Sequence, residues 1–143
     1  MHRRVLLCIL ALLAVMSCAR PGAYEEFIRV SDAVSGRFCF DIDMSDSLDI
    51  YDVWLYSRID RQRPVTLQGY DPIKLRIWWV SPSQKVYDEE VYMESGDYRG
   101  VRQLYRSGIE PSERGVWKLW VEPVNPPGGF RGLGVIFERY GAR

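Results

Sequence analysis

Alternation of apolar and polar residues recurs from Arg37 onward, and this period of two most constrains the fold. At the start of this region, Phe38 and Phe40 alternate with Cys39 and Asp41. A period of two places successive side chains on opposite sides of a β-strand, so that one side of each strand is apolar. The same pattern covers residues 51–56, 73–79, 91–93, 117–122 and 133–138. The sequence therefore predicts six strands, and residues 27–30 add a seventh if they are also extended.

Turn-forming residues separate these alternating segments. Ser81-Pro82, Ser95-Gly96-Asp97 and the segment 125–129, which contains Pro126-Pro127, are examples. Strands that are apolar on one side only are typical of antiparallel sheets, and two such sheets must pack together to bury their apolar sides. We therefore expect an all-β fold, an antiparallel β-sandwich of about six to seven strands.

Residues 98–106 depart from this pattern, because their apolar residues have helical spacing. We expect a short helix there, on which Arg99, Arg102 and Arg106 would share a face. Guanidinium groups bind carboxylates and phosphates, so this face could contact an anion such as lipid A or an anionic glycan. The alternative is a solvated face that pairs with nearby glutamates.

The N-terminal 17 residues have the features of a secretory signal peptide. Arg3 and Arg4 precede twelve consecutive apolar or small residues, from Val5 to Met16. A membrane-spanning helix needs about 20 such residues, so this stretch is too short to span. We expect it to be removed.

The residues around Cys18 predict a lipid anchor. Val15-Met16-Ser17-Cys18 resembles the bacterial lipobox, in which an aliphatic and a small residue precede a cysteine. A thiol can be alkylated by a diacylglycerol group, and cleavage before Cys18 frees an amine that can take a third chain. Two or three acyl chains anchor a protein stably. The alternative is cleavage near Cys18 without lipid.

The anchor defines the expected organisation of the rest of the chain. Residues 18–24, with Arg20 and Pro21, form a tether, and residues 25–143 form a single domain. No acidic run directly follows Cys18, which favours the periplasmic side of the outer membrane. The formal net charge is zero, so we expect no nucleic-acid partner.

Histidine and cysteine usage argues against several kinds of catalysis. The one histidine, His2, lies in the signal peptide, so the mature chain lacks the imidazole of triads, Cys–His dyads and His metal sites. With Cys8 removed and Cys18 acylated, Cys39 has no disulfide partner and is expected to be a buried, inert thiol. We predict neither enzymatic activity nor a cofactor.

The order of strands and turns resembles the lipoproteins grouped with the gliding-motility lipoprotein GldH. The resemblance covers roughly residues 24–140. It rests on 38–43, 48–58, 73–82, the Gly96-Asp97-Tyr98-Arg99-Gly100 segment, Gly115-Val116-Trp117 and Gly132-Leu133-Gly134-Val135. The resemblance implies an outer-membrane lipoprotein with a β-sandwich domain and no known enzymatic activity, which supports the motility machinery in gliding bacteria.

Five aromatic residues lie opposite the aliphatic sides of their strands and could form an exposed platform. Such a surface could bind a partner protein of the envelope or stack on the sugar rings of a glycan. The alternative is that these aromatic side chains complete a thick core. The five residues are Trp54, Tyr56, Trp78, Tyr92 and Trp120.

Four aspartates have the spacing of ligands in a calcium-binding loop, namely Asp41, Asp43, Asp49 and Asp52. The position that needs glycine for the sharp turn is Asp46, and the run starts on a predicted strand. We therefore favour a solvated hairpin over a metal site.

Together these features predict a lipid-anchored outer-membrane protein that serves as a non-catalytic assembly component of an envelope complex. The alternative is a carbohydrate-binding module that uses exposed tryptophan and tyrosine rings on a sheet. A hydrolase that uses paired carboxylates is a distant third, because nothing in the sequence singles out a pair.

Overall fold

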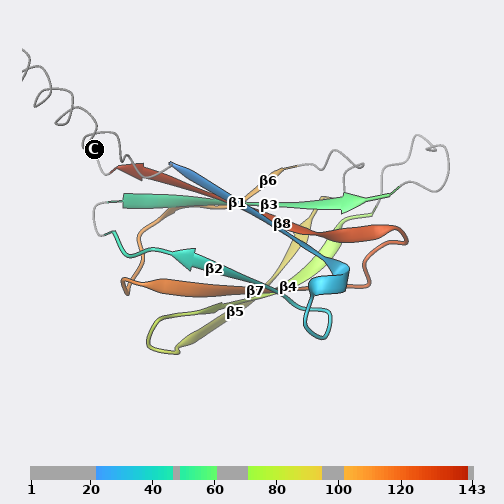
Figure 1. The fold of residues 1–143 in the computed structure, drawn as a ribbon, viewed down its shortest axis with the longest axis horizontal. Coiled ribbons are helices and arrows are strands. Elements are labelled where there is room, and N and C mark those ends of the chain that lie inside the picture. The colour runs from blue at the N-terminus through green and yellow to red at the C-terminus, as the bar shows by residue number, and fades with distance from the viewer. Residues whose placement is uncertain (1–21, 47–48, 61–70, 95–101, 142–143) are drawn as a thin grey trace, which may run out of the picture.

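The chain forms eight β-strands in a computed structural model that describes residues 22–46, 49–60, 71–94 and 102–141 (Figure 1). A short 3-10 turn, η1 (Val30–Asp32), follows the first strand. The strands are β1 (Ala23–Arg29), β2 (Phe38–Asp43), β3 (Asp49–Ile59), β4 (Ile73–Val80), β5 (Val86–Met93), β6 (Gln103–Ile109), β7 (Val116–Val124) and β8 (Phe130–Gly141).

The strands form two antiparallel sheets of four strands each. The first sheet has the order β1-β8-β3-β6 and the second has the order β2-β7-β4-β5. Figure 1 shows the two sheets as stacked layers. The prediction of an all-β antiparallel sandwich is confirmed.

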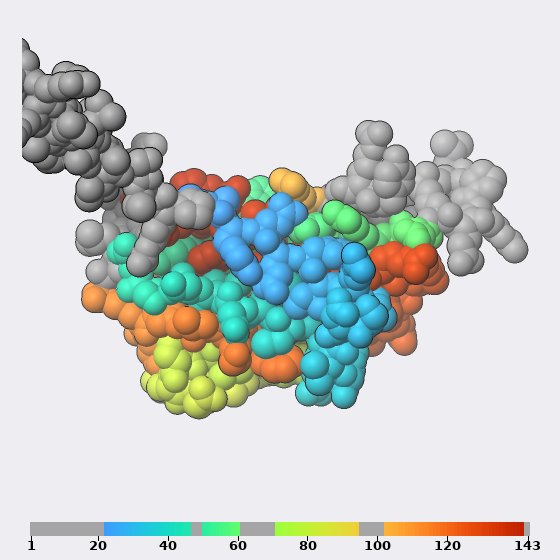
Figure 2. All heavy atoms as spheres, viewed as in Figure 1, coloured from blue at the N-terminus to red at the C-terminus, as the bar shows by residue number. Residues whose placement is uncertain are grey.

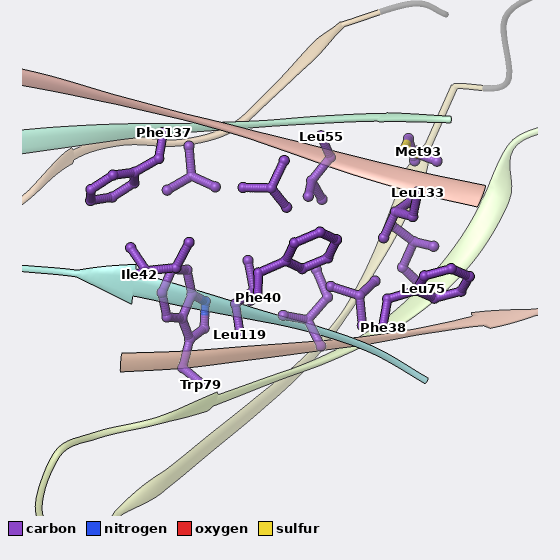
Figure 3. Close-up of a cluster of buried hydrophobic side chains, with 14 of the residues drawn as sticks. Phe38, Phe40, Ile42, Leu55, Leu75, Trp79, Met93, Leu119, Leu133 and Phe137 are labelled. Atoms are coloured by element: carbon purple, nitrogen blue, oxygen red, sulfur yellow. The ribbon is translucent and has the colours of Figure 1, made fainter. Parts of the chain in front are cut away.

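The core lies between the two sheets and consists of the predicted apolar positions. Phe38, Phe40 and Ile42 of β2 are buried, and Cys39 and Asp41 point to the outer side. Figure 3 shows Ile42 and Phe40 projecting from β2 toward the opposite sheet, where Phe137 and Leu55 lie. Burial of one side of each strand is the reason that these sequences form a sandwich.

One predicted element is wrong. Residues 103–106 belong to strand β6 and not to a helix, while residues 98–101 lie outside the described residues. The register between β3 and β6 shifts on both sides of Val53, where β6 has more residues than β3. These bulges interrupt the alternation of β6, and an interrupted period of two can imitate helical spacing.

Strand β1 begins within the segment that the sequence assigned to the tether. Ala23 and Tyr24, which the sequence assigned to the tether, are the first residues of β1 and pair with Glu138 and Phe137 of β8. The predicted signal peptide, and Cys18 with it, lies outside the described residues. Among the residues described, no helix has the length and apolar character needed to cross a membrane.

One side of the sandwich is covered by the chain itself. β1 and β2 are edge strands of different sheets, and residues 30–37 connect them. Figure 2 shows this segment running down the surface from one layer to the other. On the opposite side, the edge strands β5 and β6 are consecutive in the chain, and most of the segment between them, residues 95–101, lies outside the described residues.

Candidate binding site

The predicted aromatic platform is divided between the two outer faces of the sandwich. Trp78 and Trp120 are directly opposite each other on β4 and β7 of the second sheet. Tyr92 lies at the edge of the same sheet and is 63% exposed. Trp54 and Tyr56 lie on β3 of the first sheet, so the five rings do not form one surface.

The second sheet presents its two tryptophans among charged residues. The guanidinium of Arg37 lies 5.0 Å from the centre of the Trp78 ring, and it also pairs with Glu122 at 3.6 Å. Arg37 therefore covers ring surface that a sugar would use. Cys39, next to Trp120, is half-buried on this outer face and not in the core, and burial raises the pKa of its thiol.

The first sheet holds Trp54 and Tyr56 by hydrogen bonds. The Trp54 indole donates to Glu138 at 3.1 Å, and the Tyr56 hydroxyl donates to Glu25 at 2.6 Å. Tyr56 is only 5% exposed, so it is not the exposed ring that the sequence predicted. Burial, together with Glu25, raises the pKa of Tyr56 to about 12.

The three arginines do not form one described cluster. Arg106 points to Glu89 of β5, whereas Arg102 lies 3.8 Å from Glu25 on the first sheet. Arg99 lies outside the described residues. The two of these arginines that the structure describes, Arg102 and Arg106, therefore do not share the face that a helix would have given them.

The acidic residues with calcium-loop spacing also have separate surroundings. Asp41 pairs with Lys118 at 2.8 Å, Asp43 accepts a hydrogen bond from the Ser45 backbone, and Asp52 accepts one from the Gly108 backbone. Asp41 and Asp52 belong to different sheets. The side chain of Asp49 lies outside the described residues, and those that are described include no group of three or more potential metal ligands.

A polar network joins the two sheets across the side where β5 and β6 face each other. One nitrogen of the Arg106 guanidinium, Nη2, contacts both carboxylate oxygens of Glu89, at 2.7 and 2.8 Å. The Tyr105 hydroxyl also donates to Glu89, and it accepts a hydrogen bond from the Trp79 indole at 2.9 Å. These side-chain contacts connect β5 and β6, which belong to different sheets and do not share backbone hydrogen bonds.

The network shifts the titration of its members. Burial and the hydrogen bond to Glu89 raise the pKa of Tyr105 to about 12. Burial alone would raise the pKa of Glu89, but the hydrogen bonds from Arg106 and Tyr105 outweigh burial and lower it. The carboxylate is therefore ionised when the sheets are joined.

Glu89→Gln is expected to weaken the acid dependence of stability. A carboxyl whose pKa is lower in the folded state stabilises the fold above its unfolded pKa, near 4.5, and this stabilisation is lost as the pH falls through the folded value. The variant lacks this ionisation, so its free energy of unfolding should fall less between neutral and acidic pH. Urea unfolding at a series of pH values measures this, and an unchanged slope below pH 4.5 would contradict the role of Glu89.

An open groove of about 580 Å³ lies beside this network, between β5 on one side and the second half of β6 with the residues that follow it on the other. Its base is formed by Trp79 and Trp117, whose rings meet edge to face at 6.3 Å. Tyr87 packs against Trp117 at 6.1 Å and remains 49% exposed. The lining residues are Met44, Trp79, Tyr87, Asp88, Glu89, Arg106, Ser107, Gly108, Ile109, Glu110, Pro111, Ser112 and Trp117.

Sequence reasoning missed this groove. Trp79 and Trp117 were correctly predicted to face the core, but an alternation pattern does not show that the core is open at one side. Tyr87 and Glu89 precede the segment that was predicted as a strand. The sequence signal that could have revealed the groove is the placement of an aromatic residue, Tyr87, and an acidic residue, Glu89, on the inward side of one strand.

Comparison with known proteins finds no matching protein-family model and no matching curated protein. Among solved structures, the crystal structure of a protein from Sulfurospirillum deleyianum has a TM-score of 0.47 and 11% identity, and the match covers 84% of this chain and 98% of that one. The structure of TmCBM61 in complex with beta-1,4-galactotriose has a TM-score of 0.36 and 15% identity, and the match covers 86% of this chain and 74% of that one. Similarity this remote carries no argument about function.

Proposed function

We propose that this chain is a non-catalytic component of a bacterial envelope complex, anchored to the outer membrane by lipid on Cys18. The proposal extends the sequence resemblance to the GldH lipoproteins and the lipobox at Cys18. The domain would face the periplasm and hold a partner protein of a gliding-motility-like assembly.

The observation that supports a docking role is an apolar row on the outer face of the first sheet. Ile136 and Trp54 are direct neighbours on β8 and β3, and Leu104 of β6 lies opposite Trp54. Phe27 of β1 stacks on Tyr56 with ring centres 5.9 Å apart. The outer face of a sandwich is normally polar, and an apolar surface rimmed by charges is typical of a protein interface.

Charged side chains border this row. Glu25 and Arg102 form an ion pair at 3.8 Å beside the row. The Arg58 guanidinium lies 4.8 Å from the centre of the Phe27 ring.

Leu104 is 42% exposed and Trp54 and Phe27 are half-buried, so these three residues form the accessible part of the row. Ile136 and Tyr56 are each 5% exposed and lie beneath it. This combination of apolar centre and charged rim supports a protein partner more than a sugar.

Co-purification from membranes tests the proposal. The full-length tagged protein should fractionate with the outer membrane and carry a stoichiometric envelope protein after solubilisation. Cys18→Ser should move it to the soluble fraction, because the thiol that takes the acyl chains is gone. Leu104→Gln should reduce the recovered partner about tenfold.

Val86→Gln is the matched control. Val86 is 59% exposed on the edge of the other sheet, so this variant changes an apolar residue of similar exposure away from the row. It should leave recovery of the partner unchanged. A monomer without a partner, or equal losses in both variants, would contradict the proposed docking role.

Glycan binding on the outer face of the second sheet is less well supported. The cross-strand pair of Trp78 and Trp120 favours it, but the Arg37 guanidinium already lies over the Trp78 ring. A sugar would have to displace that contact before it could stack there.

A further inference from the structure

The groove beside the Glu89 network combines an apolar base with hydrogen-bonding groups along its rim. Trp79 and Trp117 form the base, and Tyr87 rises from β5 with about half of its surface exposed. An aromatic ring held against a second ring, as Tyr87 is against Trp117, is a fixed surface that loses little freedom when a ligand stacks on it. The volume of about 580 Å³ is in the range of small-molecule sites.

Planar polar groups line the groove next to these rings. The carboxylate of Glu89 is fixed by Arg106, and both residues keep some exposure, at 29% and 52% of their side-chain surface. Glu110, Ser107 and Ser112 add acceptors and donors from the opposite side. A ligand that suits this lining has an apolar face and hydroxyl groups at its edges.

The charges select among such ligands. Glu89 and Arg106 neutralise each other, and Glu110 adds one negative charge that has no salt-bridge partner among the residues described. Asp88, whose backbone lies opposite Trp78 in the β4–β5 register, also lines the groove and adds a second negative charge that no described salt bridge compensates. An anionic ligand would meet Glu110 without a free cation to compensate, because Arg106 is already paired.

We propose that this groove binds a neutral oligosaccharide, with one sugar ring stacked on Tyr87 and its hydroxyl groups bound by Glu89, Arg106 and Glu110. The ring carbons of a pyranose supply the apolar face, and its hydroxyl groups supply donors for the carboxylates and acceptors for the guanidinium. The site is separate from the apolar row of the first sheet, so it does not depend on the docking role proposed above.

Calorimetric titration of the full-length protein tests the proposal, in a detergent without a sugar headgroup. The probes are cellotetraose, N-acetylchitotetraose and mannotetraose as neutral ligands, and tetragalacturonate as an anionic one. At least one neutral probe should bind with a Kd in the millimolar range or below. Tetragalacturonate should bind about tenfold more weakly than that probe.

Two variants and a control locate the binding. Tyr87→Ala should raise the Kd of the neutral probe about tenfold or more, because it removes the stacking surface. Glu110→Gln should reduce the difference in Kd between the neutral probe and tetragalacturonate, because it removes a negative charge from the groove. Tyr92→Ala removes a more exposed tyrosine from the outer side of the same strand and should leave the Kd unchanged.

Thermal unfolding of each variant verifies that the fold is kept. The proposal is overturned if no neutral probe binds in the millimolar range, or if Tyr87→Ala binds as well as the wild type. A loss of binding in Tyr92→Ala, with Tyr87→Ala unaffected, would also overturn it and would move the sugar site to the outer face of the second sheet.

Discussion

Phe40→Ala is expected to lower the free energy of unfolding by about 3–5 kcal/mol. Phe40 lies in the middle of β2, is 0% exposed and projects between the two sheets (Figure 3). Its removal takes away the buried ring and leaves a cavity that two hydrogen-bonded sheets cannot fully close. Since domains of this size are stable by about 5–15 kcal/mol, the variant should lose a large part of its stability.

Urea unfolding followed by tryptophan fluorescence measures this loss, and the next residue provides the control. Asp41 follows Phe40 on β2. Its side chain points to the outer face and pairs with Lys118 at the surface. Asp41→Ala should cost less than about 1 kcal/mol, because exposed ion pairs contribute little. Equal losses in the two variants would contradict the inward and outward assignment of β2.

Gly134→Ala is expected to displace Tyr56 and to lower stability by about 1–3 kcal/mol. A Cβ atom at position 134 would lie 2.1 Å from the Tyr56 ring, which rests directly on the glycine. The displaced ring would lose its stacking on Phe27 and its hydrogen bond to Glu25. The expected loss of stability arises because the Tyr56 ring occupies the space that a side chain at position 134 would need. The backbone conformation of Gly134 does not contribute to it.

Titration of the tyrosines gives a second, specific readout. The pKa of Tyr56 is raised to about 12 by burial and by Glu25, so its release should return the pKa toward the ordinary value of 10. Ultraviolet absorption recorded against pH should then show one more tyrosine ionising near pH 10 than in the wild type. Gly141→Ala is the control on the same strand, because nothing lies within 4 Å of its added Cβ. A wild-type titration curve for Gly134→Ala would contradict the displacement of Tyr56.

Most of the fold could be predicted from the sequence, because burial of one side of a strand leaves a local trace. The alternation of Phe38, Phe40 and Ile42 identifies β2, and similar patterns lie within every other strand except β1 and β6. In β6 the bulges opposite Val53 bring Tyr105 and Arg106 to the same seam between the sheets. Strict alternation cannot predict a strand in which two consecutive side chains point toward the same side.

The candidate site was harder to predict, because it depends on which strands become neighbours. Trp54 and Trp78 were both correctly placed on the outer sides of their strands, yet they lie on opposite faces of the molecule. Tyr87 and Glu89 occupy positions that would be ordinary core in a central strand. They line a groove only because β5 is an edge strand whose counterpart, β6, belongs to the other sheet.

The order of strands also bears on when the chain can acquire its structure. β7 and β8 are the last strands in the sequence, and each occupies an interior position of its sheet. Of the strand pairs, only β3–β6 and β4–β5 can form without them. A chain emerging from the ribosome therefore has no complete sheet until residues 116–141 are free, and pairings this distant in sequence form slowly. Folding of either complete sheet is therefore expected only at the end of synthesis, once the last two strands are available.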